Sequence, residues 1–391
     1  MVSLKHSNIL GKRWTDKINE NKIMRSLVNG IFYLILSSIH KAIRQRESSP
    51  DNVVVVSLHR LGDSVFTIPA LRQIKNEYQE KIIILCFKET KPIYNLVFNE
   101  SELLVVERKH FKLNGRYATK KIRGLLSELN PKVIFDLNGD MASASLLYLL
   151  RVKEIYGLCR PQFRAIYKKC TGVRKVPHIM DIYLDAIRTK IQFENRNDIY
   201  EFPTKINKQG KILIHPSAGW SAKEWGLNKF IELGEKLSKS FSIGMIFQNG
   251  FLTSDIKYEI KKTNISLLET ENVEELVDIT TDSFLFIGND SGPLYIAGLL
   301  GIPTFTIYGP TNPLFHLPFG ENHDYIQSNL KCVPRSNEKL CFTNGGRMGC
   351  PSFECMNQLS VDTVHLRISK FIDKLLTENI KTTNSSDNDN F

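Results

Sequence analysis

The sequence predicts an α/β protein with two doubly wound halves, each built on a parallel sheet. Runs rich in β-branched residues, such as Asn52–Leu58, show no polar alternation and are typical of strands buried on both faces. These runs alternate with helical segments, as expected of parallel sheets. The polar segment 191–210, which contains Pro203, separates two halves that repeat this alternation and is the expected linker.

The first half places a candidate base at the edge of its sheet. We expect strands and helices to alternate over Asn52–Leu58, Val65–Tyr78, Lys81–Phe87, Gly115–Leu129, Val133–Leu137 and Ala142–Arg151, with one more short strand within Arg151–Arg164. Ligands of such sheets bind beyond the carboxyl ends of the strands. Asp63 follows the first strand, and Gly62 lets the backbone turn there. Asp63 is therefore a candidate general base. The structural alternative is that it caps a helix starting at Ser64.

The second half contains the most informative stretch of the chain, Phe284–Pro313. It reads as a strand, a polar turn, a short helix ended by Gly301, and a second strand at Thr304–Ile307. Asp290 and Ser291 are turn and N-cap residues. This arrangement points free backbone N–H groups and a positive helix end at one place, which suits a phosphate. A plain β-α-β crossover with a well-capped helix is the alternative.

A second loop with phosphate-binding character follows the strand Ile212–His215. Ser217 and Gly219 are small enough for close backbone approach to a phosphate, and Lys223 adds a cation. The loop lacks the G-K-[ST] ending of a Walker motif, and the chain has no G-x-G-x-x-G after its first strand, which disfavours a dinucleotide oxidoreductase. Further elements are expected at Leu227–Ser238, Ser242–Phe247, Asp255–Lys262, Val273–Thr281 and Val361–Leu376.

Composition narrows the class of partner. The 391 residues suggest two or three domains, and 42% hydrophobic with 24% charged residues describe an ordinary globular protein. The net charge of +11 favours a polyanion or an anionic membrane surface as partner. Nucleic acid is not expected, because no zinc-finger spacing or RNA-binding aromatic motif occurs.

The seven cysteines do not resemble the disulfide framework of a small secreted protein. Four of them, Cys332, Cys341, Cys350 and Cys355, lie in a loop-like region without a C-x-x-C pair. We therefore expect structural burial for them rather than zinc binding.

Residues 1–50 form a basic N-terminal extension. Apolar residues between Ile23 and Ile43 fall on one helical stripe, with basic residues on the other face and at both ends. The longest apolar run, Ile31–Leu36, is too short to span a bilayer, and no signal-peptide cleavage site follows. We expect an amphipathic helix that lies in an anionic membrane interface. Packing on the protein's own surface is the alternative.

The remaining boundaries are predicted as an N-terminal domain at 51–200, a C-terminal domain at 201–360, a closing helix at 361–378 and a disordered tail at 379–391.

Three motifs together carry a family resemblance. They are Leu61-Gly62-Asp63, Lys223-x-Trp225, and Asn289–Pro293 with Gly309-Pro310-Thr311. Over roughly residues 52–376 the chain resembles the family 9 glycosyltransferases, the ADP-heptose:lipopolysaccharide heptosyltransferases. The resemblance implies a GT-B fold, in which two Rossmann-like domains face each other across a cleft. It also implies inverting transfer of heptose from ADP-heptose, with neither a metal nor another cofactor.

The resemblance also implies roles for single residues. Asp63 matches the base that deprotonates the acceptor hydroxyl, and Lys223 matches the lysine near the donor phosphates. The donor-binding positions are Ser217, Gly219, Asp290, Ser291, Gly292, Gly309, Pro310 and Thr311. Arg60, Arg160 and Arg164 are candidates for contact with an anionic acceptor, although such residues are often merely solvated. The chain departs from the family at Tyr295, where histidine is frequent, and in Gln248–Ser254, where the usual acidic residue is missing.

The expected function is that of a glycosyltransferase bound to the cytoplasmic face of the inner membrane, acting on an anionic lipopolysaccharide or lipooligosaccharide core. One alternative keeps the fold and transfers another nucleotide-linked sugar to a cell-envelope glycan. Another is a non-catalytic nucleotide-sugar-binding relative, which the presence of both Asp63 and Lys223 disfavours.

Overall fold

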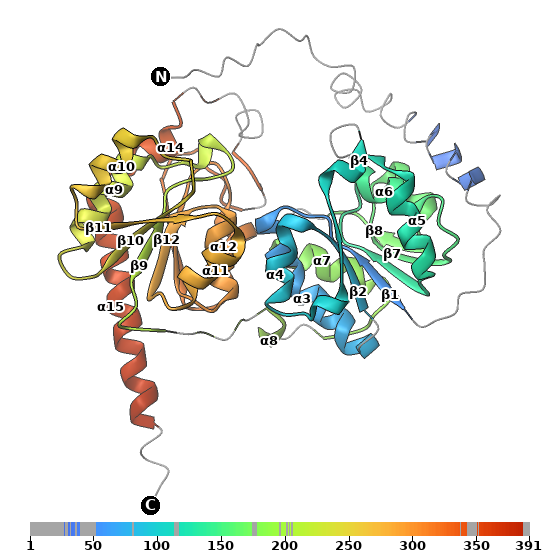
Figure 1. Cartoon of the computed structure of the whole chain (residues 1–391), viewed down its shortest axis with the longest axis horizontal. Helices are drawn as coiled ribbons and strands as arrows, with labels where there is room; N and C mark the ends of the chain where they lie inside the picture. Colours follow the sequence, from blue (N-terminus) through green and yellow to red (C-terminus); the bar gives the residue numbers. More distant parts are fainter. Residues whose placement is uncertain are drawn as a thin grey trace, which may run out of the picture.

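The computed structural model describes residues 27, 30, 31, 33–35 and 37–39, and residues 52–385 apart from 80, 81, 113–116, 174–177, 195, 196, 201, 203, 205, 337, 342–349 and 351. Two α/β domains stand side by side and are joined by the segment after Tyr200 (Figure 1). Most of the predicted N-terminal extension and residues 386–391 of the predicted tail lie outside the described residues.

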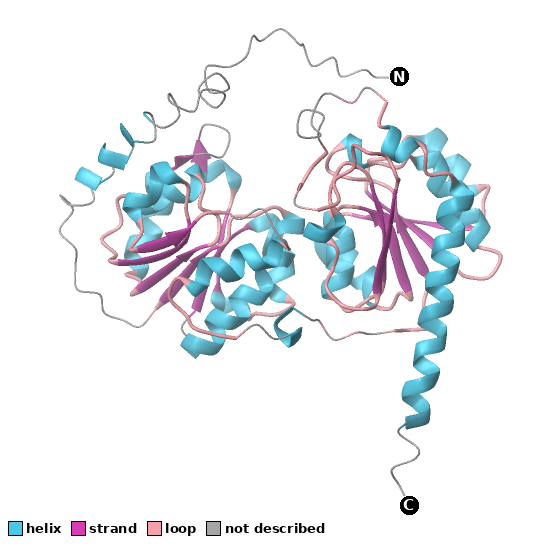
Figure 2. Ribbon diagram, turned by 180° about the vertical axis from the view of Figure 1, so that it is seen from behind, coloured by secondary structure: helices cyan, strands magenta, loops and turns pink. Residues whose placement is uncertain are grey.

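The N-terminal domain is built on a six-stranded parallel sheet in the order β3-β2-β1-β6-β7-β8. Its central strand β1 consists of four valines, all buried, because helices cover both faces of the sheet (Figure 2). A two-stranded antiparallel ribbon, β4 with β5, is attached to it. The elements are β1 Val53–Val56, α3 Leu61–Tyr78, β2 Ile82–Phe87, α4 Lys91–Asn95, β3 Leu103–Val106, β4 Phe111–Lys112, β5 Tyr117–Ala118, α5 Lys120–Leu129, β6 Val133–Asp136, α6 Met141–Leu147, β7 Glu154–Leu158, β8 Lys169–Thr171, α7 Ile179–Arg188 and α8 Asn197–Tyr200.

The C-terminal domain repeats this topology with the strand order β11-β10-β9-β12-β13-β14, again all parallel. The last helix, α15, packs against α9 and then projects beyond the domain (Figure 1). The elements are β9 Ile212–His215, α9 Leu227–Leu237, β10 Ile243–Gln248, α10 Ser254–Lys261, β11 Ile265–Thr270, α11 Val273–Thr281, β12 Leu285–Asn289, α12 Gly292–Leu299, β13 Thr304–Tyr308, α13 Pro313–His316, β14 His323–Gln327, α14 Glu354–Asn357 and α15 Val361–Ser385.

The predicted pair of doubly wound sheets is confirmed, with differences at the element boundaries. α3 starts at Leu61 rather than Val65, so the Leu61-Gly62-Asp63 motif forms its first turn. The N-cap of this helix is Arg60, which excludes Asp63 as the cap. α15 continues to Ser385, beyond the predicted end at residue 378.

The two domains meet through α3 and α12. The Phe66 ring lies 4.6 Å from the Tyr295 ring, measured between centroids, and both residues belong to a buried cluster that spans the two domains. Glycines permit this approach, because a Cβ on Gly292 would lie 3.3 Å from the backbone nitrogen of Gly62. The facing carboxyl ends of the two sheets are therefore held close together.

The cysteines behave in different ways. Cys341 and Cys355 are buried as predicted, whereas Cys332 is exposed and Cys350 is partly exposed, so the burial prediction is wrong for Cys332. Cys159 and Cys170 form a disulfide that links the end of β7 to β8. Within the described residues, no three His, Cys, Asp or Glu side chains gather in a way that could hold a metal ion. Of the helices that the structure describes, none combines the length and apolarity needed to cross a bilayer.

Candidate active site

A cavity of about 600 Å³ lies between the domains, at the carboxyl ends of both sheets. Doubly wound sheets bind ligands at the point where their strand order reverses, which here is next to β1 and β6 in one domain and β9 and β12 in the other. An adjoining cavity of about 700 Å³ shares Leu61, His215, Gln248 and Pro293 with it. The first cavity is lined by Arg60, Leu61, Gly62, Asp63 and Phe66 of the N-terminal domain and by His215, Ser217, Ala218, Gly219, Trp220, Lys223, Gln248, Phe251, Asp290, Ser291, Gly292, Pro293, Tyr295 and His316.

Asp63 presents a carboxylate to this cavity from the first turn of α3. The side chain is half-buried, and it forms no hydrogen bond or ion pair within the described part of the chain. Both oxygens are therefore free to accept a proton from a bound hydroxyl group.

Across the cavity, Asp290 holds Lys223. Asp290 is 2% exposed at the end of β12, and its Oδ2 accepts hydrogen bonds from Lys223 Nζ at 2.7 Å and from Thr311 Oγ1 at 2.6 Å. Tyr295 donates its hydroxyl to Oδ1. Burial alone would raise the pKa of Asp290, but the Lys223 charge and these hydrogen bonds outweigh it and lower the pKa to about 2. Asp290 is thus a fixed anion that positions the ammonium group.

The loop that carries Lys223 is fastened to β12 by Asn289. The amide of this fully buried residue donates to Pro216 O at 2.6 Å and accepts from Trp225 N at 3.1 Å. Trp225 in turn donates through Nε1 to Leu359 O at 2.8 Å. These bonds hold Ser217, Gly219 and Lys223 against the start of α12.

The N-terminus of α12 completes this wall of the cavity. Ser291 is the N-cap residue, but its side chain makes no capping bond, and its buried Oγ has no partner in the described residues. An N-cap hydroxyl normally satisfies a backbone N–H of the first turn. The N–H groups and the hydroxyl are therefore left for an anion, beside the Lys223 ammonium.

A family profile described as glycosyltransferase family 9 (heptosyltransferase) matches residues 124–344, more than half of the chain. The protein belongs to this glycosyltransferase family. Among curated relatives, lipooligosaccharide heptosyltransferase 2 of Campylobacter jejuni is 24% identical over 291 residues, which are 72% of this chain and 88% of that protein. Lipopolysaccharide heptosyltransferase 1 of Pseudomonas aeruginosa is 22% identical over 319 residues, with 72% and 85% covered.

Solved structures of family 9 members share the fold. A family 9 glycosyltransferase from Veillonella parvula aligns with a TM-score of 0.67 and 15% identity, covering 85% of this chain and all of that one. The E. coli heptosyltransferase WaaC, solved with ADP, aligns with a TM-score of 0.61 and 15% identity, covering 82% and 99%. The predicted GT-B architecture is thereby confirmed for this family 9 enzyme.

Several predicted site residues of this glycosyltransferase lie outside the cavity lining. Gly309, Pro310 and Thr311 stand behind Asp290: Thr311 donates to it, and Gly309 packs on Met356. These residues support the wall rather than line it. Arg60, by contrast, does line the cavity. Arg160 and Arg164 are exposed in the loop that the Cys159–Cys170 disulfide closes, and neither contributes to the lining.

Sequence reasoning missed two histidines of the lining, His215 and His316. Burial lowers the pKa of each to about 4, so both rings are neutral at pH 7. His215 ends the predicted strand Ile212–His215, and its place at a carboxyl strand end was a usable signal. No comparable signal marked His316, because it follows a loop whose path depends on the fold.

Proposed function

We propose that this family 9 glycosyltransferase transfers heptose from ADP-heptose, with inversion, to a lipopolysaccharide or lipooligosaccharide core. The observation that carries the proposal is the Asp63 carboxylate, which has no hydrogen-bond or ion-pair partner among the described residues and lines one cavity with the cation and helix N-terminus of the other domain. The relatives that are heptosyltransferases, and the similar E. coli heptosyltransferase structure with ADP-2-deoxy-2-fluoro heptose, support this choice of donor. The donor is a substrate, and the reaction as proposed uses no resident cofactor.

The two walls divide the work of the reaction. Asp63 accepts the proton of the acceptor hydroxyl. The oxygen of that hydroxyl forms a bond to the anomeric carbon of the donor sugar, while the bond from that carbon to the ADP oxygen breaks. Lys223, the Ser291 hydroxyl and the backbone N–H of Gly292 stabilise the charge that grows on the departing diphosphate. One such fixed donor is worth roughly 3–4 kcal/mol in the transition state, and general base help adds about 10²–10⁴-fold in rate. The adjoining cavity leaves room for the adenosine.

The proposal is tested with Asp63→Asn. ADP affinity, measured by calorimetry, should stay within about 2-fold of the wild type, whereas transfer to a truncated core acceptor, measured by mass spectrometry, should fall at least roughly 10²-fold. Asp255→Asn is the matched control, because it removes an exposed carboxylate from the first turn of another helix, α10. Full turnover by Asp63→Asn would place the base elsewhere. A different nucleotide sugar giving product would reassign the donor, and binding without transfer by the wild type would favour a non-catalytic role.

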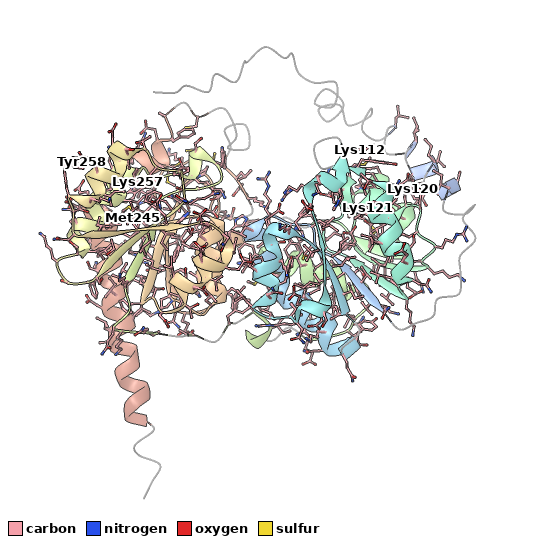
Figure 3. The ribbon with its side chains drawn as sticks, viewed as in Figure 1. Lys112, Lys120, Lys121, Met245, Lys257 and Tyr258 are labelled. Atoms are coloured by element: carbon pink, nitrogen blue, oxygen red, sulfur yellow. A yellow bond between two sulfur atoms is a disulfide. The ribbon has the colours of Figure 1, made fainter. Side chains whose placement is uncertain are left out.

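The acceptor side of the proposal is an anionic glycolipid at the cytoplasmic face of the inner membrane. The net charge is +11, and Figure 3 labels three exposed lysines, Lys112, Lys120 and Lys121, that gather on the N-terminal domain at β4 and the start of α5. The described positions between residues 27 and 39 are helical, and Leu27, Ile31, Leu34 and Ile35 are 52–65% exposed. Apolar side chains that do not pack on the domains favour membrane contact over the surface-packing alternative.

We predict that removal of residues 1–48 abolishes cosedimentation with vesicles rich in phosphatidylglycerol. A second variant separates apolar from electrostatic attraction: Leu27→Gln, Ile31→Gln, Leu34→Gln and Ile35→Gln together leave every basic residue in place. Weakened sedimentation of this variant on both neutral and anionic vesicles is expected, because the buried apolar area is lost. Unchanged sedimentation of the truncated protein would exclude the extension as the membrane-binding segment.

A further inference from the structure

His316 stands where the two walls of the cavity meet. It ends the short helix α13, which Asn312 fixes by accepting from Leu314 N at 3.0 Å and donating to Glu338 O at 2.9 Å. The next residue, Leu317, accepts a hydrogen bond through its carbonyl from His178 Nε2 of the other domain at 2.8 Å. The His316 ring also lies against Phe66 of α3, with 6.1 Å between ring centroids. Its position is therefore set by both domains.

The ring offers one polar atom to the cavity. Nδ1 is sealed from solvent and has no hydrogen-bond partner in the described residues. Nε2 forms no hydrogen bond there either, but it is not sealed off, and the residue lines the cavity. A buried polar side chain without a partner costs free energy, so such a group in a ligand cavity is expected to find its partner in the ligand.

The charges around His316 locate it along the bound substrate. Asp63, Asp290, Lys223 and Lys339 all act on it electrostatically, and burial outweighs the two carboxylates and keeps the ring neutral at pH 7. A substrate that reaches the base at Asp63 and the cation at Lys223 must place its sugar ring between them, next to His316. Nε2 of a neutral imidazole donates in one tautomer and accepts in the other; a hydroxyl group can pair with either form, whereas a phosphate, whose oxygens only accept, pairs with one.

We propose that His316 is a specificity-determining residue that hydrogen-bonds a hydroxyl group of the transferred sugar through Nε2. This inference rests on the proposed function, because it assumes that a nucleotide sugar occupies the cavity. The bond belongs to the donor sugar rather than to the acceptor, since His316 lies in the C-terminal domain with Lys223 and the start of α12. A site that hydrogen-bonds a hydroxyl group discriminates against the analogue that lacks it.

The test compares His316→Ala with the wild type on ADP-heptose and on a set of its monodeoxy analogues. With ADP-heptose, kcat/KM of the variant should fall about 10- to 100-fold, while the affinity for ADP, which has no sugar to contact, stays within about 2-fold. For one analogue the two proteins should be equally slow, because the bond is already missing. His316→Gln, which keeps a donor and an acceptor, should recover part of the rate.

His323→Ala is the matched control for loss of a buried neutral imidazole. Burial lowers the pKa of His323 to about 4 as well. His323 lies on β14, outside the lining of this cavity, and its Nδ1 is hydrogen-bonded to Thr304 Oγ1 of β13 at 2.9 Å. An equal loss for every analogue, or a parallel loss of ADP affinity, would assign His316 to packing and overturn the inference, as would wild-type kinetics in both His316 variants. If His316→Ala does not fold, His316→Gln and the wild-type preference among the analogues decide. A wild-type protein that transfers no heptose at all would instead refute the proposed function.

Discussion

Tyr295 contacts one oxygen of the Asp290 carboxylate, and Lys223 contacts the other. Tyr295 donates to Oδ1, while Lys223 and Thr311 share Oδ2. Burial, followed by the Asp290 charge, raises the pKa of Tyr295 well above its ordinary value, so the hydroxyl keeps the proton it donates. Tyr295, at the position where the family resemblance led us to expect histidine, thus serves as a hydrogen-bond donor to Asp290.

We predict that Tyr295→Phe weakens both stability and turnover. Loss of a buried hydrogen bond to a charged acceptor should lower the free energy of unfolding by about 1.5–3 kcal/mol, measured by urea titration. The freed carboxylate can then shift and take Lys223 with it, so kcat should fall by about 10-fold.

Tyr308→Phe is the matched control for this prediction. Tyr308 is a fully buried tyrosine on β13 that neighbours Tyr295, and its hydroxyl makes no hydrogen bond to Asp290 within the described residues. Its replacement should therefore lower kcat and stability less than Tyr295→Phe does. Equal effects of the two substitutions would contradict the role given to the Tyr295 hydroxyl.

The pairing of Lys223 with Asp290 marks the limit of what the sequence could predict about the site. Each residue was placed at a carboxyl strand end by its local pattern alone. Their ion pair joins residues 67 positions apart on loops after β9 and β12, which are neighbours only because the sheet reverses its strand order there. A local pattern contains no information on that meeting, and none on His316.

At the scale of elements, α3 and α12 approach closely because each begins with a glycine-containing turn. A Cβ on Gly62 would lie 3.0 Å from Tyr295 Cδ2 and 3.4 Å from Gly292 Cα. The contact couples the base, one residue after Gly62, to the tyrosine that holds Asp290. Small displacements between these helices therefore change the distance from Asp63 to the Asp290–Lys223 pair.

Gly62→Ala should lower kcat/KM by about 10-fold, because the added methyl group pushes α12 away from α3 by a few tenths of an ångström. ADP affinity should change little, since the C-terminal loops stay intact. Gly124→Ala in α5 is the control: no atom lies within 4 Å of its added Cβ, so it should gain about 0.5–1 kcal/mol in stability and keep full activity. Thermal unfolding and steady-state kinetics of both variants test this prediction. Wild-type kcat/KM in Gly62→Ala would show that the contact between α3 and α12 accommodates the methyl group without affecting the reaction.

The central strands were predicted, whereas the four edge strands β3, β8, β11 and β14 were missed, β3 even though Leu103–Val106 is an apolar run. β1 and β9 are covered on both faces, so their sequences are uninterrupted apolar runs, and their bounds were predicted closely. The edge strands β8 and β14 contain Lys169, His323 and Asp324 and are partly exposed, so no apolar run marks them. Their strand state comes from pairing with β7 and β13, which is a tertiary effect.

At the scale of the whole molecule, the contact between the domains continues beyond α3 and α12, because the His178 ring also lies 5.6 Å from the Phe66 ring of α3, measured between centroids. His178 Nε2 pairs with Leu317 O, and the Tyr200 ring stacks on Phe319 with 4.9 Å between centroids. Both contacts add to the packing that holds the two domains together.

Folding stability as a whole should depend on pH through buried histidines. Burial lowers the pKa of His59 and His178, and most strongly that of three others, His215, His316 and His323. The pKa of each of these three falls from an ordinary 6.5 to about 4. Above pH 6.5 the folded and unfolded states are both neutral, and no stability is lost. Between pH 6.5 and about 4 the unfolded chain takes up protons that the folded protein excludes, so stability falls with falling pH. At about 1.4 kcal/mol per pKa unit, each of these three histidines costs on the order of 3 kcal/mol at pH 4.

One buried carboxylate opposes this trend. Burial raises the pKa of Asp136 from 3.8 to about 6, so the folded state binds a proton first and gains stability as pH falls from 6 towards 3.8. Three histidines outweigh one aspartate, and urea unfolding at pH 7, 6, 5 and 4.5 should therefore give a falling free energy. His323→Gln removes one titrating ring outside the cavity. The unfolding free energy of this variant should therefore fall less steeply with falling pH, by a slope that corresponds to the uptake of at most one proton. If the unfolding free energies of the wild type and His323→Gln change with pH in parallel, His323 has the same pKa in the folded and unfolded states, which would contradict the prediction.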